Sequence, residues 1–155
     1  MIPPELLMGY PFFAGLNQAE LYSLSIIASQ VSWPPGGFIF EENEQAHTMY
    51  LLLDGWVDIV INTSSKSKRR ELVTTLTPGE ILGWSALVEP HFYTASAVCA
   101  SPVKAVEFRG VDLRALFGID QQLCCTVTTR ICQVIAGRLR ATRLQMVSLF
   151  VASAP

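Results

Sequence analysis

Three short segments in the middle of the chain each join an apolar run to a glycine turn: Pro34-Pro35-Gly36-Gly37-Phe38-Ile39-Phe40, Tyr50-Leu51-Leu52-Leu53-Asp54-Gly55 and Pro78-Gly79-Glu80-Ile81-Leu82-Gly83. Glycine allows a positive φ and a close approach of neighbouring backbone, so all three segments have a local reason to turn. Asp-Gly after an apolar run is a strong hairpin signal. We therefore expect short strands here, with a hairpin at Asp54-Gly55.

The whole region between residues 38 and 108 is predicted to consist of short strands separated by turns. Apolar or alternating runs occur at 38–40, 49–53, 56–61, 72–76, 95–99 and 103–108. Spacings of roughly 8–12 residues are typical of a β-sandwich or barrel. Residues 63–70 are hydrophilic, and we interpret them as a solvated hairpin tip; anion binding by their basic cluster is the alternative.

Helical patterns flank these strands. Asn17 is a good N-cap residue, and Glu20 stands in the capping-box position. The apolar positions that follow are at helical spacing, so we expect a helix that stops before the prolines at 34 and 35. A short helix is expected over residues 111–117, with Gly118 ending it.

A long helix is expected over residues 120–150, with Asp120 as its N-cap. Apolar residues recur there at steps of three, four or seven. This apolar stripe consists of Leu123, Val127, Ile131, Val134, Ile135, Leu139, Met146 and Phe150. A body of this size cannot cover so long a helix at ~1.5 Å per residue, so we expect part of the stripe to contact a second copy of the chain.

Length and composition predict one domain spanning residues 1–155. Half of the residues are hydrophobic and 15% are charged, which excludes intrinsic disorder. The longest uncharged stretch, residues 21–40, contains serines, a glutamine and two prolines, so we expect no membrane span. The first five residues lack a basic segment followed by an apolar core, and we expect a cytoplasmic protein without a signal peptide.

Charge is divided unevenly along a chain whose net charge is −2. Residues 1–120 hold 7 basic and 13 acidic residues, whereas residues 121–155 hold four arginines and no acid. We interpret this division as an interface, or as an electrostatic match between the last helix and the acidic body, rather than as nucleic-acid binding.

The four cysteines, Cys99, Cys124, Cys125 and Cys132, form no CxxC pair and have no neighbouring histidine. This spacing does not suggest a zinc site, and reduced thiols are expected. Cys125 and Cys132 are seven residues apart, and we expect both to act as small buried hydrophobes on one helix face. A redox role is the alternative.

The order of helix, about eight short strands, hydrophilic hairpin tip and long terminal helix resembles the cyclic nucleotide-binding domain family. That family includes bacterial catabolite-activator-type sensors, protein kinase A regulatory subunits and gated channels. The resemblance covers nearly the whole chain and rests on the three glycine segments. It implies a mainly β fold, a β-jelly-roll (double-stranded β-helix) with flanking helices and a long C-terminal helix.

The family binds its ligand in a phosphate-binding cassette, which the resemblance places at residues 82–96. A glycine turn that opens a short helix presents free backbone N–H groups to a phosphate. The family pattern is Gly-Glu-x-Ala-Leu, then Arg-x-Ala-Thr or a close variant; the Glu binds the ribose 2′-hydroxyl and the Arg pairs with the cyclic phosphate. The implied site residues are Gly83, Trp84, Ser85, Ala86, Leu87, Tyr93, Thr94, Ala95 and Ser96.

The sequence departs from this pattern at both charged positions. Trp84 stands in place of the Glu and Tyr93 in place of the Arg. Thr94 and Ser96 still carry hydroxyls that can donate hydrogen bonds to a phosphate. The two aromatic residues either line a pocket for a less charged ligand or fill the pocket themselves. We favour an altered or lost ligand site over conventional cyclic AMP binding.

Two functions therefore compete. One is a stand-alone regulatory or sensor domain that binds a cyclic nucleotide or another small molecule and acts through its last helix. The resemblance implies that this helix forms a homodimer and covers the ligand with residues 138–146, where Thr142 or Arg143 faces it. The other is a ligand-free dimerisation or protein-interaction module.

The sequence gives little support to three other functions: haem binding, catalysis and nucleic-acid binding. Haem would need His47, His91 or a cysteine as axial ligand, and we expect no cofactor. No nucleophile motif or paired-carboxylate site indicates an enzyme. Family transcription factors carry a helix-turn-helix after the long helix, whereas only residues 147–155 would follow it here, so we expect no direct nucleic-acid binding.

Overall fold

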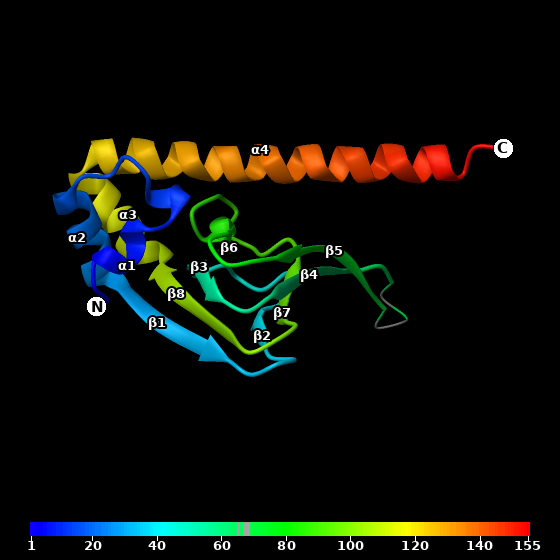
Figure 1. Cartoon of the computed structure of the whole chain (residues 1–155), viewed down its shortest axis with the longest axis horizontal. Helices are drawn as coiled ribbons and strands as arrows, with labels where there is room; N and C mark the ends of the chain where they lie inside the picture. Colours follow the sequence, from blue (N-terminus) through cyan, green and yellow to red (C-terminus); the bar gives the residue numbers. More distant parts are fainter. Residues whose placement is uncertain (65, 67–68) are drawn as a thin grey trace.

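The computed structural model describes residues 1–64, 66 and 69–155, and its centre is a β-jelly-roll of two antiparallel sheets (Figure 1). The strand orders are β1-β8-β3-β6 and β2-β7-β4-β5. The strands are β1 (Ala28–Trp33), β2 (Phe38–Phe40), β3 (Thr48–Asp54), β4 (Val57–Asn62), β5 (Arg70–Leu76), β6 (Ile81–Leu82), β7 (Ser96–Cys99) and β8 (Val103–Arg109). The mainly β fold class is confirmed.

Helical segments gather at one end of the roll and along its side. They are α1 (Glu5–Met8), η1 (Pro11–Phe13), α2 (Gln18–Ile27), η2 (Trp84–Ala86), α3 (Gly110–Ile119) and α4 (Gln121–Ala152). The capping box is confirmed, because Asn17 Oδ1 accepts from the Glu20 N–H and Glu20 Oε2 accepts from the Asn17 N–H, both at 2.9 Å. Asp120 likewise caps α4 by accepting from the Leu123 N–H.

Two local predictions are wrong, and one strand was not predicted. The first helix ends at Ile27 because the next six residues form β1, which pairs with β8 in a register that begins at Ala28↔Phe108. Asp54-Gly55 is not a hairpin, since β3 and β4 belong to different sheets. Gly118 lies inside α3 and does not end it.

Gly55 explains why the turn after β3 contains a glycine although it forms no hairpin. Its φ is +89°, and a Cβ there would lie 2.1 Å from the carbonyl oxygen of Pro102. The residue therefore allows the chain to cross between the sheets against the 101–102 turn. The predicted hairpin at residues 63–70 does join β4 to β5, and residues 65, 67 and 68 of its tip lie outside the described residues.

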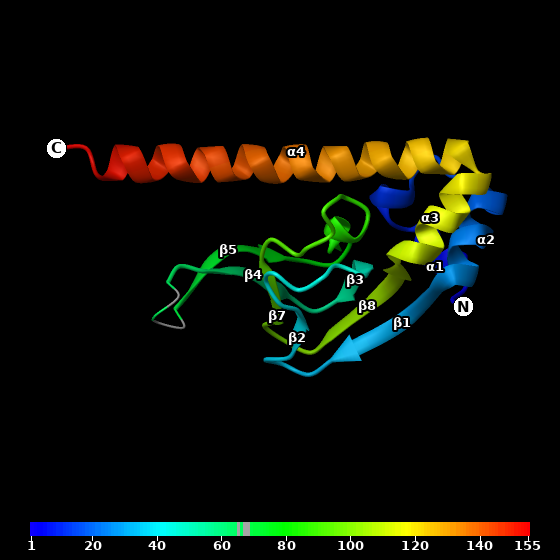
Figure 2. The ribbon, with the colours of Figure 1, turned by 180° about the vertical axis from the view of Figure 1, so that it is seen from behind.

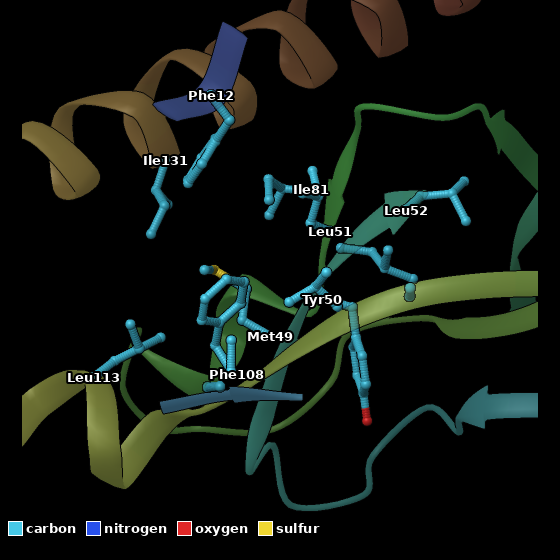
Figure 3. Packing of buried hydrophobic residues seen from close by; sticks show 14 of the residues in the cluster. Phe12, Met49, Tyr50, Leu51, Leu52, Ile81, Phe108, Leu113 and Ile131 are labelled. Carbon is cyan, nitrogen blue, oxygen red and sulfur yellow. The ribbon is translucent and has the colours of Figure 1, made fainter. Parts of the chain in front are cut away.

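One hydrophobic core holds the sheets and helices together (Figure 3). Phe108 of β8 and Met49 and Leu51 of β3 are almost fully buried at its centre. Phe12 from η1 and Ile131 from α4 join the same cluster. Packing of α4 on this core places the helix along one side of the roll.

The helix α4 runs well past the core, as both whole-chain views show (Figures 1 and 2). Leu123, Val127 and Ile131 near its start are buried, whereas Met146 and Phe150 near its end are 53% and 72% exposed. The apolar stripe therefore begins inside the protein and ends in solvent. Among the described residues, no helix has the length and apolar character needed to cross a bilayer.

The prediction for two cysteines is wrong. Cys125 and Cys132 are both exposed, because α4 turns a different face, that of Leu123, Val127 and Ile131, toward the core. The arginines of α4 also make no ion pair with the acidic body in the described part of the chain, where ion pairs join only Arg69 to Glu71 and Arg109 to Asp112.

Candidate functional site: the cassette between β6 and β7

Gly83 opens the cassette in a conformation that other residues rarely adopt. Its φ is +77°, and a Cβ would lie 2.7 Å from the Thr48 carbonyl oxygen and 3.4 Å from the rings of both Phe40 and Tyr93. The one-turn helix η2 follows immediately. The predicted glycine turn before a short helix is therefore present, and its geometry requires glycine.

Tyr93 fills the centre of the site. Its ring lies parallel to that of Phe40, with centroids 3.8 Å apart and an interplanar angle of 10°. Its hydroxyl donates to the Thr48 carbonyl at 2.7 Å and accepts from the Thr48 N–H at 3.3 Å. Burial raises the pKa of this phenol, and only 5% of the residue is exposed. The side chain is thus held at both its face and its polar tip.

Trp84 lies beneath a cation from the last helix. The guanidinium carbon of Arg138 is 4.4 Å from the centroid of the Trp84 ring, and Arg138 also donates to the Ile81 carbonyl. Burial lowers the pKa of Arg138 to about 10, an effect that the negative charge of Glu80 partly offsets. Arg138 remains charged at neutral pH, so the contact is a cation–π interaction between α4 and the cassette.

Two further cassette residues are held by the surrounding structure. Ala86 is fully buried, and its carbonyl accepts from Arg114 of α3 at 2.7 Å. The Ser96 hydroxyl is buried and accepts from the Glu42 N–H at 2.9 Å, so it supports the turn after β2. The cassette is therefore fastened to both α3 and α4.

The space left inside the cassette is small. A cavity of about 40 Å³ is lined by six of the nine predicted residues and by four others. The predicted lining residues are Gly83, Trp84, Ser85, Tyr93, Thr94 and Ala95, and the others are Phe40, Ile59, Leu82 and Arg138. Small-molecule sites typically enclose roughly 300–1,000 Å³. The cassette cavity is therefore well below this range.

Comparison with known proteins identifies the family and its fold. The sequence profile of the cyclic nucleotide-binding domain matches residues 30–120, more than half of the chain. A crystal structure from Geobacter metallireducens GS-15, of a protein named for cyclic nucleotide binding, is 34% identical. It superposes with a TM-score of 0.79 over 90% of this chain and 99% of that one. This chain belongs to the cyclic nucleotide-binding domain family.

More distant members share the same fold. A cyclic nucleotide-binding domain from Methylobacillus flagellatus superposes with a TM-score of 0.80 at 18% identity, over 93% of this chain and 80% of that one. A Mycobacterium tuberculosis protein described as a CRP-like cAMP-activated global transcriptional regulator is 24% identical over 97% of this chain. The chain spans 65% of that relative's length.

The predicted cover residues do not reach the cassette of this family member. Thr142 is exposed and its hydroxyl donates to the Arg138 carbonyl within the helix, and Arg143 is exposed as well. Arg138, one turn earlier, is the α4 residue that lines the cavity. Of the histidines considered as haem ligands, His91 places Nδ1 3.0 Å from the Ser85 carbonyl oxygen, and His47 is exposed.

The sequence did not reveal the residues that contact the cassette from other parts of the chain. Phe40, Thr48 and Arg114 lie 28 to 53 residues away from their cassette partners along the chain. No local pattern marks such contacts, because they depend on which strands and helices become neighbours. The charge of Arg138, in a tail without acids, was the available signal for the contact from α4.

Replacing Tyr93 with Phe tests whether the hydroxyl contributes to stability. The variant loses the bonds to Thr48, and we expect the free energy of unfolding at pH 7 to fall by about 1–2 kcal/mol in urea denaturation. A pKa raised by folding favours the protonated native state, so this contribution is complete below pH ~10 and is lost as the pH rises through the folded pKa. Wild type should therefore lose more stability than the variant between pH 9 and 11.5.

Tyr22→Phe is the matched control, because Tyr22 is 55% exposed. It should leave both the stability at pH 7 and its alkaline decline unchanged. Equal stability and equal alkaline slopes for wild type and Tyr93→Phe would contradict this description of the site.

Proposed function

We propose that this chain is a non-enzymatic, cytoplasmic regulatory domain whose cassette is closed to cyclic nucleotides by its own side chains. The observation that carries the proposal is the placement of Tyr93, stacked on Phe40 and bonded to Thr48 where the family has its phosphate-binding arginine. This arrangement supports the alternative in which Tyr93 fills the pocket itself, over the one in which it lines a pocket for a less charged ligand.

Energetics support the same proposal. A cyclic nucleotide here would lack both charged family partners, and hydrogen bonds to charged groups contribute on the order of 1.5–3 kcal/mol each. At ~1.4 kcal/mol per factor of ten, losing two of them weakens a micromolar site to the millimolar range. The nucleotide must in addition displace the Tyr93 ring, whose stacking contributes about 0.5–1.5 kcal/mol.

A protein of the same fold offers a parallel. A structure from Trypanosoma brucei, with a TM-score of 0.69 at 22% identity, is described as the regulatory subunit of a cAMP-independent protein kinase A. A variant of that protein with three substitutions is described as bound to cAMP. By analogy, we infer that a few substitutions can be enough for a domain of this fold to hold cyclic AMP.

Output through α4 follows from the contacts of the cassette. Arg138 joins Trp84 to α4, and Arg114 joins Ala86 to α3, which leads directly into α4. Any effector that moves η2 must either break these contacts or move α3 and α4 together with η2. The regulatory signal would therefore pass from the cassette to the long helix.

Calorimetric titration with cyclic AMP and cyclic GMP tests the closed cassette. Wild type should show no binding tighter than about 1 mM. The double variant Trp84→Glu with Tyr93→Arg restores the family's charged residues, and it should bind cyclic AMP at least roughly tenfold more tightly than wild type.

The control variant carries the same substitutions at two exposed aromatic residues, Trp56→Glu with Tyr22→Arg. It should bind no better than wild type. Micromolar binding of either nucleotide by wild type would show that the cassette opens, and would favour a conventional sensor domain.

We also propose that α4 forms a homodimer through the outer part of its apolar stripe. Ile135 is half-buried, and Leu139, Met146 and Phe150 are exposed along one side of the helix. A stripe with this spacing is the pattern by which helices of two copies pack along each other. The second copy would cover the apolar residues that the body leaves in solvent.

Sedimentation equilibrium tests this dimer. Met146→Glu with Phe150→Glu should convert a dimeric wild type to monomer, because four charges would be buried in the interface. Val147→Glu with Val151→Glu introduces the same charges at residues of similar exposure on the neighbouring face of α4, about 100° around the helix, and should remain dimeric. A monomeric wild type, or dissociation by the control pair alone, would contradict the proposed interface.

A further inference from the structure

Two thiols lie on the outer face of α4, away from the roll. Cys125 and Cys132 are both free and exposed. Leu123, Val127 and Ile131 form the buried side of this part of the helix. At 3.6 residues per turn, the two cysteines lie about 140–160° around the helix from Val127, the middle of that buried side. Both thiols therefore face solvent on the side that the roll leaves open.

These cysteines share one heptad position with apolar residues of the proposed dimer contact. Cys125, Cys132, Leu139 and Met146 follow one another at intervals of seven residues. Leu139 and Met146 are 49% and 53% exposed. Residues seven apart drift by only about 20° on an α-helix, so the four form one line along its surface. Because the drift accumulates, Cys132 lies closer than Cys125 to the contact at Leu139 and Met146.

The helix surface around Cys132 is small and uncharged. Thr128, Thr129 and Ala136 lie one turn before and after it, and all three are exposed. Helices pack with their axes about 8–10 Å apart, which leaves about 3.4–5.4 Å between facing Cα atoms on two cylinders of ~2.3 Å radius. Disulfides usually join Cα atoms roughly 4.4–6.8 Å apart. Two Cys132 residues that face each other are therefore within bridging distance.

The distribution of apolar residues on this face favours parallel pairing of two α4 helices. Leu139, Met146 and Phe150 lie in the outer half of the helix, whereas Gln121 and Cys125 occupy the same face at its start. Of the two ways to pair α4 over its full length, only the parallel one sets apolar residues against apolar residues. In a parallel two-fold pair, the residues nearest the axis face their own copies.

We propose that Cys132 is a redox modification site, at which a peroxide joins two copies of the chain through a disulfide between their Cys132 residues. The inference rests on the homodimer of the proposed function. One Cys132 thiol loses its proton, and the thiolate attacks the peroxide to form a sulfenic acid. The second copy's Cys132 thiolate attacks the sulfenic sulfur and forms the S–S bond. Each step releases hydroxide, which takes up the proton that a thiol gave up, so hydrogen peroxide is reduced to two waters.

The bond changes how dimerisation depends on concentration. A reduced dimer dissociates on dilution, whereas two linked chains stay together. Disulfides of cytosolic proteins are usually transient and redox-sensing. Cys132 is exposed, so reducing thiols reach the bond and reverse it. The position of α4 in the pair would thus be fixed under oxidising conditions only.

Treatment of the reduced, purified chain with hydrogen peroxide tests the site. Trypsin separates Cys132, in peptide 131–138, from Cys124 and Cys125, in peptide 115–130. Mass spectrometry should find peptide 131–138 linked to a second copy of itself, and a denaturing gel without reductant should show a covalent dimer that dithiothreitol reverses. Cys132→Ser should lose most of this dimer. Cys125→Ser, the matched control at an exposed thiol of the same heptad position, should keep it.

The failure of this inference differs from the failure of the homodimer. A reduced wild type that is dimeric in sedimentation, but gives no link between two 131–138 peptides, would overturn the inference alone. A link between peptides 131–138 and 115–130 as the main product would also overturn it, because parallel pairing does not bring them together. Equal cross-linking of wild type and Met146→Glu with Phe150→Glu would show random collision of exposed thiols. A monomeric reduced wild type would overturn the homodimer, and this inference with it.

Discussion

The stack of Tyr93 on Phe40, fixed by two hydrogen bonds to Thr48, is the contact on which the rest of the cassette depends. It joins β2 and the start of β3 to the loop before β7, and the ring lies 3.4 Å from where a Gly83 Cβ would stand. Gly83 has a φ of +77°, and a Cβ there would lie 2.7 Å from the Thr48 carbonyl oxygen, so the position requires glycine. The cavity beside it measures about 40 Å³. Under the proposed function, aromatic stacking takes the place of the charge pairing that the resemblance assigns to this position.

The second constraint is the way in which α4 is attached to the roll. Its arginines donate hydrogen bonds to carbonyls and cover an aromatic ring, and they form no ion pair with a carboxylate of the described residues. Arg130 donates to Ala14, and Arg138 donates to Ile81 and covers Trp84. These contacts leave both positive charges without an ionic partner among the described residues. The helix is consequently tied both to Ala14 after η1 and to the cassette by contacts that involve no carboxylate.

Local signals in the sequence were sufficient for some features and not for others. The caps at Asn17 and Asp120 were predictable because their hydrogen bonds span three residues. The strand β1 and the turn at Gly55 were not, since they depend on pairing with β8 and on contact with Pro102, both far along the chain. The same reasoning applies to the site. The glycine turn before a short helix was predictable by pattern, and six of the nine predicted residues line the cavity. That Arg138 rather than Thr142 lines it depends on how the buried start of α4 orients the helix on the core.

The claim that Tyr93 closes the cassette is tested most directly by the backbone amide NMR spectrum of the wild-type protein with cyclic AMP added to 10 mM. The resemblance places the family's phosphate at the amides of residues 83–87. These amides therefore report occupancy of the cassette even when binding is weak or releases little heat. We predict that these resonances stay in place within the shifts caused by an equal concentration of simple salt. Saturable movement of the Gly83 and Ser85 amides, together with loss of the Tyr93 contact to Phe40, would contradict the account.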